Sequence, residues 1–385
     1  PKFKTTDVYF ESRMHHGGNI RRVTRQETGS RRALLSVQLA LVLLAVSVLT
    51  TRSGPQSSLP KPTIPLRRAR VVAIEDPEAV RAFQAVETRL KGMVDQGLTE
   101  LTGEPDVPSA WLSLVSPQDV IGIKVFSAPG STSGTRPAVV SGLIQSLITA
   151  KFDPQRIIIW DKHSADLKNA GFSELSTRFG VQVQGAAEAG YEETSFYESP
   201  LLGTPVWGDL EFGKSGPGIG RNSHVSKLLT RKITKIINVT PLLNHNLAGV
   251  SGNLFGLAFG SVDNSIRFET SAQRMATAIP ELFALPELWD RVVLNIVDAL
   301  ICQYQGEERT HLHYAAMLGQ LRFSQDPVAL DVLSVKELQS QRKLAGITER
   351  PINSQIFTNA SLLEIGISDL SKIDLLISPR TSPPR

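Results

Sequence analysis

The stretch RIIIWD, residues 156–161, decides the fold class, because it is an unbroken apolar run that ends in a carboxylate. A strand that is apolar on both faces is typical of a parallel sheet covered by helices on each side. Similar runs recur at VIGIKVF (120–126), KIINV (235–239) and VVLNIVDAL (292–300). Strand-like and helix-like segments alternate between them. We therefore predict an α/β fold with a largely parallel sheet and helices on both faces.

The remaining periodicity predicts the elements around these strands. VVAIE (71–75) has the composition of a strand, and apolar residues at three- and four-residue spacing predict a helix over 77–102. A second helix is predicted over 137–151, a short one over 164–170, and a further strand over 181–184.

The charge of the chain is unevenly distributed. The formal net charge is +4, but eight Lys and Arg precede residue 33 and five lie within 51–70. The remaining residues carry 28 basic against 34 acidic side chains. Because binding to a nucleic-acid duplex needs a clustered basic face, we expect no nucleic-acid partner. The single cysteine, Cys302, excludes an internal disulfide, a c-type haem attachment and a cysteine-ligated iron–sulfur cluster, and we expect no cofactor.

An apolar segment near the N-terminus predicts a membrane anchor. It reads ALLSVQLALVLLAVSVLT, begins at Ala33 and ends at Thr50, and has leucines such as Leu41 and Leu44 along its length. Eighteen residues without a charge span about 27 Å as a helix, close to the thickness of the hydrocarbon core. We therefore predict one transmembrane helix ahead of the α/β fold.

The flanks of this segment bear on its topology. Arg31 and Arg32 directly precede it and resemble a twin-arginine export signal, although Sec export is equally compatible with paired arginines. Because no A-x-A site follows, we expect the anchor to stay uncleaved. We predict a single-pass protein of the inner (cytoplasmic) membrane with its body on the periplasmic side. A cytoplasmic body on an inverted anchor is the alternative.

Composition divides the chain into five parts. These are a cytoplasmic N-terminal arm (1–32), a transmembrane helix (33–50), a Pro/Ser-rich linker (51–70), an α/β body (71–377) with an irregular excursion (186–232), and a polar C-terminal tail (378–385).

Six blocks follow one another along the body. They are DVIGIKV (119–125), RIIIWDKHSADLKNAGF (156–172), KIINVTPLLNHNLAGVSG (235–252), FGSVDN (259–264), VLNIVDAL (293–300) and SQDPVALDVL (324–333). In this order they resemble an uncharacterised α/β family, domain-of-unknown-function family 362, from about residue 71 to 345. The resemblance implies the fold but no common reaction.

The chain departs from the pattern of that family at three places. Members usually carry Asn where this chain has Phe126, and a Lys-Asn pair where it has Phe255 and Gly256. A Gly-Gly-Pro-like turn of the family is QGEERT here, residues 305–310. All three lie at strand ends or glycine turns, where α/β proteins bind ligands. The resemblance thus implies that an ancestral site has been lost.

Two residues are candidates for catalysis if the body is an enzyme. His245 follows a buried strand and lies near Gly249 and Gly252, where it could act as a ligand or general base, or could hold a glycine turn. Asp161 ends the RIIIWD strand, where it could act as an acid or cap the helix that begins near Ser164.

Other residues give weaker candidates. His311 and His313 would share one face of a strand and could bind a metal, but a solvated loop is favoured. GKSGPGIG (213–220) lacks the phosphate-loop pattern and is interpreted as a loop. Asp326 precedes Pro327 and is expected to cap a helix, and Cys302 is expected in the core.

These observations favour a non-catalytic, single-span accessory subunit of a large membrane complex. It would carry no electrons itself and would brace or dock cofactor-bearing neighbours on the outer face. We expect other subunits and the lipid bilayer as partners, with a photosynthetic reaction-centre or light-harvesting assembly favoured over a respiratory one. The alternative is a membrane-tethered exported enzyme or a metal- or small-ligand-binding protein of the same family.

Overall fold

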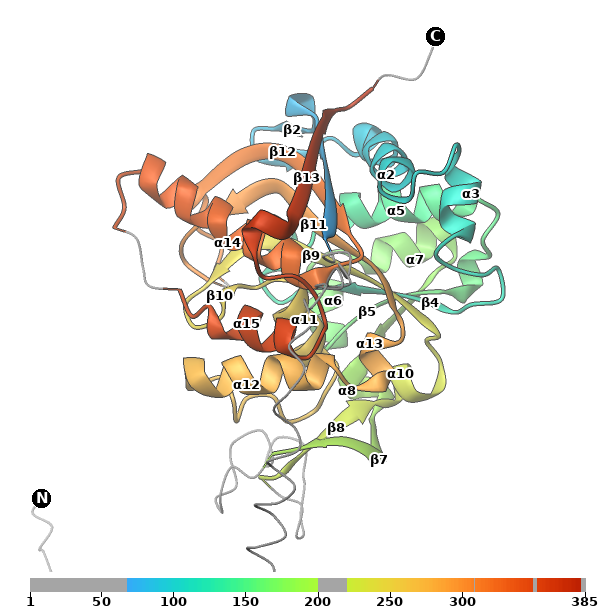
Figure 1. Ribbon diagram of the computed structural model, residues 1–385. Helices are drawn as coiled ribbons and strands as arrows, with labels where there is room; N and C mark the ends of the chain where they lie inside the picture. The colour runs from blue at the N-terminus through green and yellow to red at the C-terminus, as the bar shows by residue number, and fades with distance from the viewer. Residues whose placement is uncertain (1–67, 200–219, 308, 349–351, 382–385) are drawn as a thin grey trace, which may run out of the picture. The chain divides into compact units, whose positions relative to one another are not determined.

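The computed structural model describes residues 68–199, 220–307, 309–348 and 352–381 (Figure 1). One sheet runs through this part of the chain in the order β13-β1-β12-β11-β9-β4-β5-β6, and β10 pairs with β9. Its strands are β1 (Ala69–Glu75), β4 (Ile121–Val125), β5 (Ile157–Asp161), β6 (Gln182–Gly185), β9 (Lys235–His245), β10 (Gly249–Val250), β11 (Val292–Gln303), β12 (Ala315–Ser324) and β13 (Ile373–Pro379).

The sheet is largely parallel, as predicted. The neighbours from β11 through β9, β4 and β5 to β6 all run in one direction, and β13 runs parallel to β1. The long strand β12 runs against both of its neighbours, and the short β10 runs against β9. The α/β class is therefore confirmed.

Helices cover the sheet on both faces. They are α2 (Glu87–Thr102), α3 (Val107–Leu112), α4 (Gly130–Ser133), α5 (Pro137–Thr149), α6 (Ser164–Asn169), α7 (Ser173–Phe179), α8 (Ala186–Ala189), α10 (Lys227–Arg231), α11 (Asn253–Gly260), α12 (Ala272–Phe283), α13 (Pro286–Trp289), α14 (Pro327–Leu344) and α15 (Gln355–Leu362).

Two hydrophobic clusters fill the space between these helices and the sheet. Strand β5 contributes to both, because successive side chains of a strand point to opposite faces. Ile157 and Ile159 pack in the cluster with α2, α3 and α5, whereas Ile158 and Trp160 pack in the cluster with α11, α12, α14 and α15. Figure 1 shows the two groups of helices on either side of the sheet.

The helix predicted over 77–102 is shorter than expected. A 3-10 turn (Pro77–Ala79) and a hairpin of β2 (Val80–Arg81) and β3 (Gln84–Ala85) precede α2. Ala82 and Phe83 turn this hairpin with φ angles of 49° and 60°, a conformation that no helix contains. The apolar spacing continued through the turn and so masked the boundary.

The ends of the body and the excursion also differ in detail from the predicted divisions. Strand β1 begins at Ala69, within the predicted linker, and β13 continues through Pro379, within the predicted tail. The two segments pair with each other, which accounts for both extensions. In the excursion, β7 (Tyr191–Glu198) and β8 (Asn222–Ser226) form a separate antiparallel pair, and most of GKSGPGIG lies outside the described residues.

No helix in the described part of the chain is long and apolar enough to cross a membrane. The predicted anchor, with Ala33, Leu41, Leu44 and Thr50, lies outside the described residues, as does the N-terminal arm.

The order of the strands creates a switch point. From β4 the chain moves outward through β5 to β6, and it then returns to β9 on the other side of β4. In open α/β sheets, ligands bind at such a point, in the crevice at the carboxyl ends of the strands.

Candidate functional site

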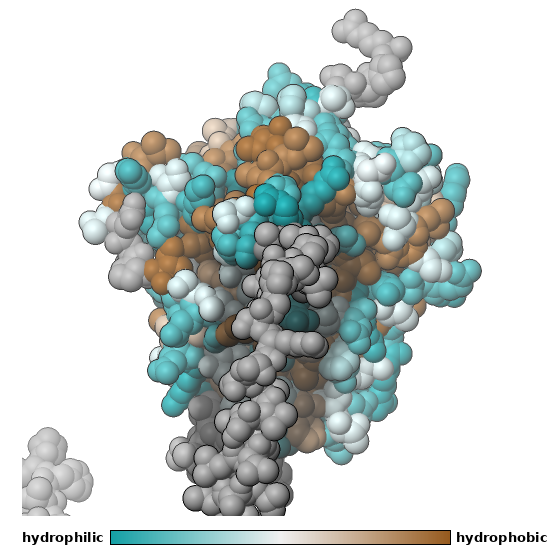
Figure 2. All heavy atoms as spheres, in the orientation of Figure 1, coloured by the Kyte–Doolittle hydropathy of each residue, from teal (hydrophilic) through white to brown (hydrophobic). Residues whose placement is uncertain are grey.

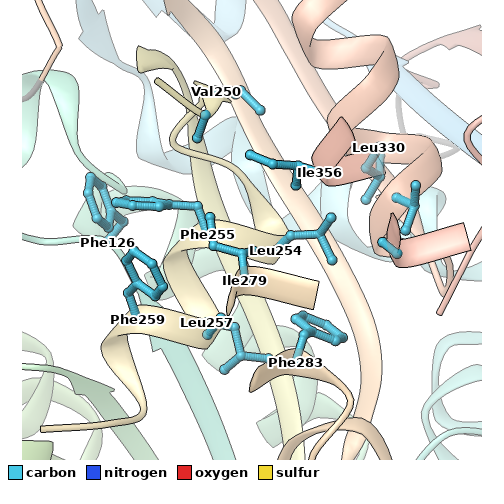
Figure 3. Close-up of a cluster of buried hydrophobic side chains, with 14 of the residues drawn as sticks. Phe126, Val250, Leu254, Phe255, Leu257, Phe259, Ile279, Phe283, Leu330 and Ile356 are labelled. Atoms are coloured by element: carbon cyan, nitrogen blue, oxygen red, sulfur yellow. The ribbon is translucent and has the colours of Figure 1, made fainter. Parts of the chain in front are cut away.

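The crevice between the carboxyl ends of β4 and β9 is occupied by aromatic side chains. Phe126 directly follows β4, and Phe255 lies in the first turn of α11. Their rings meet edge to face with centroids 6.0 Å apart, and only 8% and 6% of the two residues are exposed. Figure 3 shows the two rings side by side with Phe259 next to them. Phe126 and Phe255 thus come together at the switch point.

The rings extend into a wider group that we call the aromatic cluster, made of Phe126, His245, Phe255, Phe259 and Phe268. The Phe255 ring is the centre of this group, because its centroid lies 4.6 Å from that of His245 and 5.3 Å from that of Phe259. Tilted and edge-to-face pairs at these distances stabilise beyond the area they bury. The cluster fills much of the crevice with packed apolar surface.

His245 holds a turn at the edge of this cluster. It is the last residue of β9, and its Nδ1 accepts hydrogen bonds from the amides of Leu247 (3.2 Å) and Ala248 (3.0 Å). The following residue, Gly249, has a φ of 86° and starts β10. Desolvation lowers the pKa of His245, with the carboxylate of Glu307 acting in the opposite direction. The ring is therefore neutral at pH 7, and its Nδ1 lone pair is used by the backbone.

Asp161 forms a buried ion pair with Lys124, a residue that the sequence analysis did not single out. Lys124 Nζ lies 2.7 Å from Asp161 Oδ1, and the two residues are 1% and 5% exposed. The amide and the hydroxyl of Ser127 both donate to Oδ2 at 2.7 Å. Burial pushes the pKa of Asp161 upward, but the Lys124 charge and the bonds from Lys124 and Ser127 outweigh it and hold that pKa below its ordinary value.

The surroundings of this pair exclude one of the two roles considered for Asp161. The amide of Ser164, at the start of α6, donates to the carboxylate of Glu188 at 3.1 Å, so Glu188 occupies the capping position. On the other side Gly260 lets α11 approach, because an added Cβ would lie 2.4 Å from Lys124 Cε. The single Lys within the apolar run VIGIKVF was the signal that could have revealed the pair.

A small cavity of about 120 Å³ lies between the pair and the aromatic cluster. Its lining is aromatic at Phe126, Phe255 and Phe259 and polar at Lys162, His163, Asp166 and Glu269. Partial burial raises the pKa of Asp166, the His163 ring opposes this, and the carboxylates of Asp161 and Glu188 add to it. A space of this size and character holds a few waters or a small organic cation.

His313 lies in a 3-10 turn (Leu312–Tyr314) and His311 directly precedes it, so neither residue is on a strand. Their ring centroids are 5.3 Å apart, and the His313 ring packs against Tyr314. In the described residues, no group of three or more His, Cys, Asp and Glu side chains is arranged to hold a metal ion.

Two further residues that the sequence singled out, Asp326 and Cys302, have structural roles. Asp326 accepts from the Ala329 amide at 2.9 Å and caps α14, whose first residue is Pro327. Cys302 is buried in β11, and burial raises the pKa of its thiol.

Asp331, which the sequence analysis did not consider, caps α11 from within α14. Its carboxylate accepts from the amides of Asn253 (2.7 Å) and Leu254 (2.9 Å) and from the Asn253 side chain. Desolvation raises the pKa of Asp331 to about 6, although these hydrogen bonds act to lower it.

Comparison with known proteins identifies a family to which the chain is similar. A family model described as a domain of unknown function (DUF362) matches residues 121–336. No curated protein matches the chain. A structural-genomics crystal structure of a Thermotoga maritima protein matches at 11% identity with a TM-score of 0.38, over 71% of this chain and 63% of that protein.

Proposed function

Since the chain belongs to the DUF362 family, which is described only as a domain of unknown function, we propose a function from its own residues. The α/β body is non-catalytic and serves as an accessory subunit of a larger membrane assembly. The observation that carries this proposal is the narrowing of the switch-point crevice to a cavity of about 120 Å³ by Phe126 and Phe255, whose exposed fractions are 8% and 6%.

The geometry of the candidate catalytic residues supports the same proposal. A general base needs a free lone pair within reach of a substrate. The Nδ1 of His245 accepts two backbone amides, and the carboxylate oxygens of Asp161 accept from Lys124 and from Ser127. The hydrogen-bond acceptors of both side chains are therefore occupied by groups of the fold. On this proposal the body contributes packing surfaces to the assembly and has no reaction centre.

The membrane part of the proposal comes from the sequence outside the described residues. The uncharged run 33–50 anchors the chain in the inner membrane, with residues 1–32 on the cytoplasmic side and the body on the outer face. There it braces or docks neighbours that carry cofactors, and it needs no cofactor of its own. A photosynthetic reaction-centre or light-harvesting assembly fits this design.

Purification of the full chain from its native membranes in mild detergent tests the proposal. We expect other subunits to co-purify and the product to absorb as pigment or haem does. A lone chain without coloured partners, purified under conditions that keep known complexes intact, would rule the accessory role out.

A second function is favoured by the 120 Å³ cavity, since its aromatic wall and the carboxylates of Asp166 and Glu269 suit a small organic cation, with Lys162 of the same lining acting against it. In this alternative the tethered body binds a small ligand. A thermal-shift titration with tetramethylammonium and with divalent metals tests it. Saturable stabilisation that is lost in Asp166→Asn but kept in Glu174→Gln, a change on α7, would favour this function.

A further inference from the structure

Strand β13 ends the sheet and exposes a row of apolar side chains. Leu375, Leu376 and Ile377 are consecutive in it and are 43%, 44% and 54% exposed. Figure 2 shows hydrophobic residues gathered at the upper centre of this face, where Figure 1 draws β13. The strand order gives β13 one neighbour, β1, in the described part of the chain. An apolar edge strand is a ready template for pairing with another strand.

The direction of the free backbone groups follows from one hydrogen bond. The amide of Arg380, directly after β13, donates to the Glu75 carbonyl of β1 at 2.8 Å. Backbone groups of a strand alternate in direction with a period of two. The amides of Leu376 and Ser378 therefore face β1, and those of Leu375 and Ile377 face away from the sheet.

The side chains of β13 divide between two surfaces. Leu375 and Ile377 line a groove of about 200 Å³ whose other wall is α14, at Leu333 and Lys336. On the opposite face Ser378 Oγ donates to Glu100 Oε2 of α2 at 2.7 Å. Leu376 shares that face with Ser378, because it is two residues away.

Strand β13 has little net charge at the edge of the sheet. Asp374 is the one charged residue in the sequence of β13, and it is paired within the same chain. Arg68 Nε lies 2.8 Å from Asp374 Oδ2, and the second guanidinium nitrogen contacts Oδ1. The Lys side chains with which proteins commonly protect an edge are missing from this segment, and Pro379 closes its end.

We propose that β13 pairs antiparallel with β13 of a second copy of this chain, about a twofold axis through Leu376. In this register Leu375 lies opposite Ile377 of the other copy, and both residues present their outward-facing backbone groups to each other. Asp374 lies opposite Ser378 of the other copy, so the two carboxylates stay apart. The strand is complementary to itself, which is why a second copy is the occupant that fits.

Cross-linking of the full chain tests this register. Leu376→Cys places two thiols opposite each other in a non-hydrogen-bonded pair, where Cα atoms lie about 4.5 Å apart and a disulfide can form. Because Cys302 is buried, the unmodified chain gives the background. Mild oxidation should give a dimer in non-reducing gels. The matched control, Leu362→Cys on α15, is 76% exposed and should stay unlinked.

A positive charge placed on the proposed twofold axis gives a second test of the dimer. Leu376→Lys opposes two ammonium groups and should weaken dimerisation at least about tenfold in sedimentation, whereas Leu362→Lys should leave it unchanged. Circular dichroism checks that both variants fold, and the cysteine pair remains decisive if the lysine variant does not. A monomeric unmodified chain, or equal cross-linking at 376 and 362, would overturn the proposal. So would a chain that is monomeric alone and forms a complex only with a different protein.

Discussion

Lys124 and Asp161 lie on neighbouring parallel strands and form a buried ion pair. The pair is almost fully buried, with Ser127 and the Val125 carbonyl completing its hydrogen bonds. A buried pair adds modest stability as a whole, but the loss of one partner leaves an uncompensated charge in the core.

The ion pair therefore makes a prediction about single and double variants. Lys124→Met should lower the free energy of unfolding by about 3–5 kcal/mol, because Asp161 would stay buried without its partner. The double variant with Asp161→Leu should recover a large part of this loss. Denaturant unfolding measures both, and Lys372→Met, which breaks an exposed pair with Asp369, should cost less than about 1 kcal/mol. Additive losses in the double variant would contradict the coupling.

The raised pKa of Asp331 predicts how the folding stability depends on pH. Its pKa is raised from 3.8 to about 6 in the folded protein, so the folded state binds the extra proton and stability falls as pH rises through this range. In Asp331→Asn this dependence is absent. The stability of the variant relative to the unmodified chain should therefore improve from pH 4 to pH 7, by at most about 3 kcal/mol.

A second capping residue provides the control for this pH experiment. Asp106 caps α3 and accepts from the Ser109 amide, and these hydrogen bonds lower the pKa of Asp106. Its contribution is present above the ordinary pKa and is lost on acidification. The difference for Asp106→Asn should thus stay nearly constant from pH 4 to pH 7 and change in the opposite direction below pH 4. A flat difference for Asp331→Asn would refute the raised pKa.

At the scale of elements, two glycines of α2 differ in what lies against them. An added Cβ at Gly97 would lie 2.3 Å from the Phe323 ring of β12, whereas at Gly92 the nearest atoms belong to the flexible end of Arg380 at 3.0 Å. Close contact between α2 and the sheet therefore depends on Gly97 in particular.

Alanine substitutions separate these two glycines. Alanine favours a helix by about 1 kcal/mol over glycine, but overpacking costs about 1–3 kcal/mol or more. We expect Gly97→Ala to destabilise the body and Gly92→Ala to leave it unchanged or slightly more stable. Thermal unfolding of the two variants measures the difference, and equal effects would mean that α2 can shift away from β12.

The elements also show what the sequence could predict. The buried parallel strands were predictable, because unbroken runs such as 156–161 have no other common explanation. The hairpin at 80–85 was not, since it depends on positive φ angles at Ala82 and Phe83 that ordinary side chains rarely adopt. The Lys124–Asp161 pair was hidden for another reason. Only the register of β4 on β5, in which Lys124 lies beside Trp160, brings these two residues together.

At the scale of the whole molecule, the proposed anchor makes a prediction about which treatments extract the chain from membranes. If residues 33–50 hold it there, washing with high salt or alkaline carbonate should leave the full chain in the membrane fraction, because apolar insertion is not screened by ions. Deletion of 33–50 should release the protein. Release of the full chain by salt alone would show that the basic flanks hold it electrostatically instead.

The pairing of β1 with β13 has a consequence for the order of folding. Arg68 and Asp374, joined by an ion pair beside these strands, are 306 residues apart in the chain. The neighbours of β1 in the sheet are β12 and β13, which a ribosome synthesises long after β1. Strand β1 therefore has no partner in the sheet until the chain through β12 and β13 has been made. Contacts this distant in sequence slow folding, and an incomplete sheet would leave the edges of β1 and β11 open to aggregation until β12 has been made.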